Sequence, residues 1–227
     1  MSKTVRIAAL GASLLLAASA LFSCGNNGQI ADSYEIIKES TDKALAIESG
    51  EILVYEMNTA AKDIEGYSLN SSSETYIRFT GTESPDFDLN ATKTDIASGE
   101  TEAYELIKDG DSVLELFDGQ GEFVEDAEIP DIFELFRVEF GTSDIKSVEV
   151  VRMEKGVQLY SLTMSEKYAN KFDTEADGVV TDCTGVVLSY YINSVKELQK
   201  VVCEYTSTVT VDGESTEVVK AIDAQIA

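Results

Sequence analysis

The sequence predicts an α+β domain built on one strongly curved antiparallel sheet, an incomplete β-barrel, with helices covering its concave face. The first observation is an apolar repeat of helical spacing near the start of the domain. The second is a long series of short segments in which apolar and polar residues alternate, as in strands with one buried face. The third is a pair of Asp-Gly turns, Asp109-Gly110 and Asp212-Gly213, which favour tight hairpins. One antiparallel sheet of so many strands curls, and its apolar concave face needs a cover.

The first half of the domain predicts a helix followed by strands. A helix is expected at residues 30–47, because Ile30, Tyr34 and Ile37 recur on one side of it. The alternating segments after it predict strands at residues 51–59, 74–80, 86–91, 102–108, 112–117 and 122–124.

The second half begins with another expected helix, at residues 129–140, where Pro130 suits a first helical turn and three Phe residues follow. A hairpin and a short helix at residues 165–172, capped by Ser165, come next. The strands expected in this half cover residues 147–153, 157–164, 185–192, 198–211 and 216–224.

The N-terminal segment predicts export and lipid attachment. Residues 1–6 are basic, and residues 7–22 form an apolar run that is shorter than the roughly 20 residues of a bilayer span. The sequence LFSCG at 21–25 resembles the lipobox of bacterial lipoproteins, which implies acylation of Cys24 and cleavage before it. We therefore expect a signal peptide at residues 1–23, a lipidated Cys24 with a short tether at 24–29, and one domain at 30–227. The expected location is the extracytoplasmic face of the cell membrane.

The composition excludes several classes of protein. The chain contains no histidine, which rules out Ser-His-Asp triads, Cys-His dyads and His-ligated metal sites. Its 42 acidic residues outnumber 17 basic ones and give a net charge of -25 at pH 7, which argues against a nucleic-acid partner. No Gly-rich phosphate loop, GxSxG or CxxC motif is present. The sequence therefore predicts neither an enzyme nor a bound cofactor.

Several segments together resemble one family. They are the lipobox, the helix before residues 51–59, YELIKDGD at 104–111 leading to FDG at 117–119, and VLSYYIN at 187–193 through Tyr205 to TVDG at 210–213. They resemble the LolA/LppX-like superfamily of periplasmic carriers and surface lipoproteins, in the version found in Gram-positive bacteria. The resemblance implies a half-barrel whose helices cover an apolar cavity for a lipid-like or other hydrophobic molecule. The candidate lining residues are Leu53, Tyr55, Met57, Ile77, Phe79, Leu114, Leu116, Phe133 and Phe136.

Two further patterns each have two interpretations. Residues 173–178 resemble the start of an EF-hand calcium loop, but they also suit an acidic surface loop. The candidate oxygen ligands are Asp173, Glu175, Asp177 and Asp182. Cys183 and Cys203 lie out of register on neighbouring predicted strands, either as two small apolar residues or as a disulfide.

Two functions remain open at this stage. In the first, an envelope lipoprotein binds a hydrophobic molecule in a half-barrel cavity of, on the order of, several hundred Å³. In the second, a non-catalytic interaction or sensing module has a core filled by its own side chains, and an exposed apolar patch or a loop contacts an envelope protein. Phe side chains from residues 129–140 packed into the sheet would favour the second.

Overall fold

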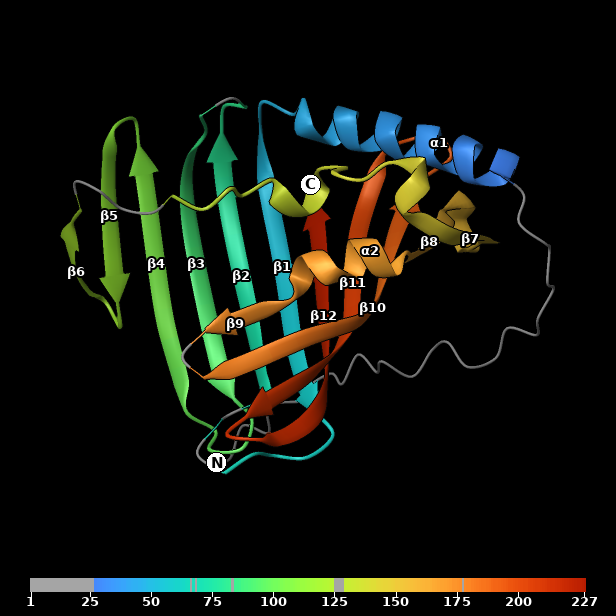
Figure 1. The fold of residues 1–227 in the computed structure, drawn as a ribbon. Coiled ribbons are helices and arrows are strands. Elements are labelled where there is room, and N and C mark those ends of the chain that lie inside the picture. Colours follow the sequence, from blue (N-terminus) through green and yellow to red (C-terminus); the bar gives the residue numbers. More distant parts are fainter. Residues whose placement is uncertain (1–26, 66, 68, 83, 125–128, 177) are drawn as a thin grey trace, which may run out of the picture.

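The computed structural model describes residues 27–227 apart from residues 66, 68, 83, 125–128 and 177, and one sheet dominates it (Figure 1). The helical elements are α1 (Asn27–Leu45), α2 (Glu166–Ala169) and the 3-10 turns η1 (Glu134–Phe136), η2 (Thr142–Asp144), η3 (Glu154–Gly156) and η4 (Asn170–Phe172). The strands are β1 (Ser49–Ala60), β2 (Ser71–Thr80), β3 (Asp86–Asp95), β4 (Thr101–Asp109), β5 (Ser112–Phe117), β6 (Gln120–Phe123), β7 (Ile145–Arg152), β8 (Gln158–Met164), β9 (Thr174–Ala176), β10 (Val179–Ile192), β11 (Leu198–Val211) and β12 (Glu214–Ile226).

The described strands pair in the order β6-β5-β4-β3-β2-β1-β12-β11-β10-β8-β7, with β9 beside β10. All of these pairs are antiparallel. The end strands β6 and β7 do not meet, so the sheet curves but stays open (Figure 1). Asp118-Gly119 and Asp212-Gly213 have positive φ at both residues, which suits the two-residue turn that follows the strand twist. The predicted antiparallel sheet is confirmed.

The concave face of the sheet carries the main core. Ile52 of β1 lies opposite Ile77 of β2 and Ile226 of β12, and Leu89 and Leu106 continue this row across β3 and β4. All five side chains are buried in one cluster. Successive side chains of a strand point to opposite faces, so this row defines which residues of these five strands face inward.

The helix expected at residues 129–140 is wrong. Residues 129–144, named the strap below, are mostly irregular and contain only the short turns η1 and η2. The strap crosses in front of β4, β3 and β2 and inserts Phe133 and Phe136 into the core (Figure 1). The backbone N–H of Phe133 donates to Asp131 Oδ1 at 3.1 Å, a local hydrogen bond that competes with a helical turn. Phe and β-branched residues also favour a helix weakly, and a helix of this length is marginal without strong packing.

Helices cover the other half of the concave face. Helix α1 lies against β7, β10 and β11, with Ile37 fully buried. Ser165 Oγ accepts the backbone N–H of Tyr168 at 3.3 Å, so the predicted cap of the short helix is confirmed. One continuous series of aromatic contacts, with ring centroids 5.4 to 6.0 Å apart, joins α1, the strap, α2, η4 and β11 through Tyr34, Phe140, Tyr168, Phe172 and Tyr205.

Candidate functional site

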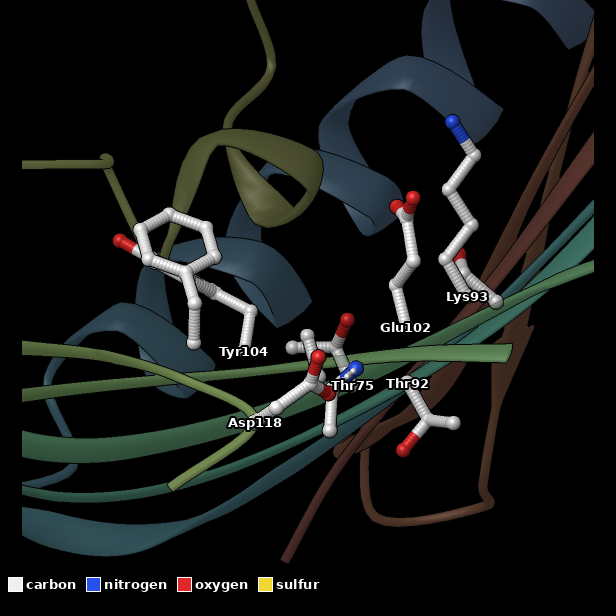
Figure 2. A pocket seen from close by; sticks show the side chains of 10 residues that line it. Thr75, Thr92, Lys93, Glu102, Tyr104 and Asp118 are labelled. Atoms are coloured by element: carbon white, nitrogen blue, oxygen red, sulfur yellow. Dashed lines mark hydrogen bonds between the residues drawn. The ribbon is translucent and has the colours of Figure 1, made fainter. Parts of the chain in front are cut away.

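An open hollow of about 540 Å³ lies on the concave side of β2, β3, β4 and β5 (Figure 2). None of its described lining residues comes from the strap or from a helix, so the covering segments leave this part of the sheet accessible. It is lined by Ser73, Thr75, Ala91, Thr92, Lys93, Glu102, Ala103, Tyr104, Phe117 and Asp118.

Two cross-strand rows form the floor and walls of the hollow. Thr75, Ala91, Tyr104 and Phe117 stand side by side on β2 to β5 in the first row. Ser73, Lys93 and Glu102 form the second row, two residues further along each strand. Both rows share a face with Ile77 and Leu89, because the pairing places them an even number of residues away. The side chains of Ser73, Thr75 and Ala91 in these rows are small and leave space above the sheet. The core rows beside them are filled by larger apolar side chains.

Aromatic rings form one wall of the hollow. The rings of Tyr104 and Phe117 have their centroids 5.0 Å apart at a tilt of 46°. Phe117 is 61% exposed, although it lies on the concave face of the sheet. The Tyr104 hydroxyl donates to Glu115 Oε1 at 3.2 Å. Burial, then the negative charge and hydrogen bond of Glu115, raises the pKa of Tyr104 above its ordinary value.

Charged side chains line the rest of the hollow. Lys93 and Glu102 are cross-strand neighbours, yet no ion pair joins these two side chains (Figure 2). Asp118 Oδ1 accepts the backbone N–H of Ala103 at 3.3 Å, which holds the β5–β6 turn against β4.

Glu56 of β1 lies next to Ser73 and continues the second row. Its carboxylate forms an ion pair with Lys220, whose Nζ lies 2.7 Å from Glu56 Oε1. Burial lowers the pKa of Lys220, but its hydrogen bond and attraction to Glu56, with a contribution from Tyr205, outweigh burial and leave the pKa raised. The Glu56 charge is therefore largely neutralised at the border of the hollow.

Four of the predicted cavity residues lie in the filled part of the concave face. Ile77, Phe79, Phe133 and Phe136 are all buried in the main core. Phe133 meets Phe79 edge to face, with ring centroids 5.0 Å apart. These side chains pack on one another and fill the space that a deep cavity would occupy. Their role in binding a ligand stays a prediction.

The other five predicted residues lie on the wrong face for a concave cavity. Leu53 alternates with the inward-facing Ile52, and Tyr55 and Met57 follow on the same outer face, 41% and 38% exposed. Leu116 belongs to the outer row that contains Leu53, and Leu114 lies on that face beside Ile107. Strand β1 has apolar residues on both faces, so the alternation alone does not tell which face is covered.

Sequence reasoning missed the residues that line the hollow. Thr75 and Ala91 are too small to be singled out as ligand residues, and Glu102 lies among acidic residues that are typical of a solvated strand edge. One usable signal was Phe117, a large ring directly before an Asp-Gly turn in an alternating strand. Its pairing with Tyr104 would have located the wall of the site.

Of the residues proposed for calcium, Asp173, Glu175 and Asp182 lie in or beside the β9–β10 hairpin. Glu175 pairs with Val180 in the β9–β10 hairpin, and Asp173 Oδ1 accepts the backbone N–H of Cys183 at 2.7 Å. Asp182 lies on β10, and Asp177 lies outside the described residues. In the described part of the chain, no three His, Cys, Asp or Glu residues gather in a way that could hold a metal ion.

The two described cysteines are free and buried. Cys183 pairs with Ser207, and Cys203 pairs with Leu188, on opposite sides of a bulge between Cys183 and Gly185. The interpretation as small apolar residues therefore fits the structure.

The predicted signal peptide and the lipidation site Cys24 lie outside the described residues. Among the helices that are described, none is both long enough and apolar enough to cross a bilayer.

Comparisons with known proteins gave one structural likeness that we report. No protein-family model matches the chain. The curated proteins gave no match either. Among solved structures, the chain is similar to LprF from Mycobacterium bovis, with 10% sequence identity and a TM-score of 0.45 over 87% of this chain and 92% of that one.

Proposed function

We propose that this protein is a lipid-anchored lipoprotein of the extracytoplasmic membrane face that binds a small, partly apolar molecule in the hollow and catalyses no reaction. The observation that carries the proposal is the hollow itself. Its volume of about 540 Å³ lies within the range of small-molecule sites, and it combines aromatic walls with a few polar groups. The lipobox-like sequence around Cys24 supports the anchor.

The filled core sets the depth at which a ligand is held. Phe133 and Phe136 occupy the end of the concave face that a deep cavity would need. The ligand therefore lies against Tyr104, Phe117 and Ala91 near the rim, with one side in contact with water. A ligand held in this way exchanges without any movement of the strap.

Native mass spectrometry on residues 25–227, followed by extraction and identification of any bound molecule, tests the proposal. We expect a stoichiometric adduct that is lost in Phe117→Asp and kept in Phe123→Asp. Phe123 is the matched control, because it is an exposed ring on the neighbouring strand and points to the outer face. An adduct that survives Phe117→Asp would place the ligand elsewhere.

One observation favours a second function, a non-catalytic envelope interaction module. The strap buries Phe133, Phe136 and Phe140 against the sheet, as expected of a core filled by its own side chains. If the purified chain shows a bare mass after incubation with envelope lipids and with extracted metabolites, the binding proposal fails. The search then moves to protein partners of the exposed β5–β6 edge.

A further inference from the structure

The arrangement of charge and rings in the hollow points to one class of ligand. Resting on the proposed binding function, we infer that the hollow selects organic cations, in which a positively charged nitrogen adjoins an apolar body. The nitrogen lies over the Tyr104–Phe117 wall near the carboxylates of Glu102 and Asp118. The apolar body covers Ala91 and Thr75.

The first step of the argument is the local charge. Among the described lining residues, Glu102 and Asp118 are acidic and Lys93 alone is basic. Lys93 stands directly opposite Glu102 in the second row, so the negative charge of Glu102 offsets the positive charge of Lys93. The attraction of Lys93 for an anion is therefore weakest at the end of the hollow formed by Tyr104 and Phe117. Glu115 adds a third carboxylate beside the Tyr104 hydroxyl. A charge within the hollow therefore meets more negative than positive groups.

The second step separates this local field from the overall acidity of the chain. At physiological salt, charges more than about 8 Å apart are largely screened in water. The net charge of -25 therefore attracts any cation weakly and everywhere, whereas the lining groups act at contact distance. An anion would have to approach Glu102 and Asp118 with only Lys93 to bind it.

The third step is the wall itself. The face of an aromatic ring attracts a cation within about 6 Å of its centroid. Phe117 lines the hollow, is exposed and lies next to Tyr104, with the ring centroids 5.0 Å apart, so a cation over the open side of this ring pair lies within reach of both rings. The Tyr104 hydroxyl already donates to Glu115, which keeps it from competing as a donor to an anionic ligand.

Saturation-transfer NMR titrations on the full-length chain in nanodiscs of zwitterionic lipid test the inference, with empty nanodiscs as the blank. The probes share a benzyl group: benzyltrimethylammonium, neutral benzyl alcohol and anionic phenylacetate. We expect the cation to bind about fivefold or more tightly than the other two, as one cation–π contact and nearby carboxylates provide. Equal binding of all three probes, lost in Phe117→Leu, would refute cation selection and leave the proposed function standing.

Matched variants locate the preference. Phe117→Leu and Glu102→Gln should each weaken cation binding about twofold to fivefold, the range that exposed ring and ion-pair contacts give. Phe123→Leu and Glu105→Gln change the same residue types on the outer face of adjacent or identical strands and should have no effect. A cation preference that is the same in all four variants would mean diffuse attraction and overturn the inference. Failure of every probe to bind would overturn the proposed function as well.

Discussion

Replacing Phe136 by alanine measures how far the strap belongs to the core. The Phe136 side chain is 0% exposed and lies in the main cluster with Phe133 and Phe140. Removing a buried Phe side chain typically costs about 3–5 kcal/mol, through lost burial and the cavity left behind. Domains of this kind have a total stability of about 5–15 kcal/mol, so this one change should remove a large share of it.

Urea unfolding followed by circular dichroism is the assay. With a denaturant dependence of about 2 kcal/mol per molar urea, the midpoint should fall by roughly 1.5–2.5 M. The matched control is Phe123→Ala, whose ring is 76% exposed, and its stability should change by less than about 0.5 kcal/mol. A loss below about 1 kcal/mol for Phe136→Ala would show that the strap detaches freely. The concave face would then contain a cavity that the strap merely occupies.

Three further predictions concern the anchor, the thiols and the chain terminus. A Cys24→Ala variant should lose its membrane fraction on cell fractionation, since no acyl chain can then be attached. Burial, with a smaller effect of Cys183, raises the pKa of the Cys203 thiol from about 9 to about 11. The unfolded thiol ionises first, so stability should fall by roughly 2–3 kcal/mol between about pH 9 and 11, and Cys203→Ala should flatten that slope in urea titrations. In Gly50→Ala the new Cβ would lie 2.5 Å from the Ala227 carbonyl oxygen, so thermal unfolding should show that the free energy of unfolding falls by about 1–3 kcal/mol. Gly185→Ala is the control, because its new Cβ would face open space and the stability should not change.

The strands were predictable because each carries its own local signal. Alternation located β1 to β5, β7, β8, β11 and β12, and the Asp-Gly turns located two of the hairpins. The strap was not predictable in the same way. Its Phe residues recur at helical spacing, yet they are buried against a surface formed by strands distant in sequence, such as β2. Long-range packing of this kind overrides a short apolar repeat.

The inward face of β1 could not be predicted from the sequence for a different reason. Ile52 and Val54 are as apolar as Leu53, Tyr55 and Met57, so a period of two is compatible with either face being covered. Only the pairing with a neighbouring strand decides which face of β1 is covered. Ile77 of β2 lies opposite Ile52, and this pairing excludes Leu53 from the core row. The hairpin register contains information that the strand alone does not.

The position of the hollow follows from the same register. The core row contains Ile77 on β2 and Leu89 on β3, and the next row on the same face has Thr75 and Ala91 at the corresponding positions. These steps run in opposite directions along the chain, because the strands are antiparallel, and they coincide in space only when the strands are paired correctly. Large side chains at 75 and 91 would continue the core by a row and close the space beside Tyr104. The small side chains at these two positions are therefore what keeps the concave face open beside the strap.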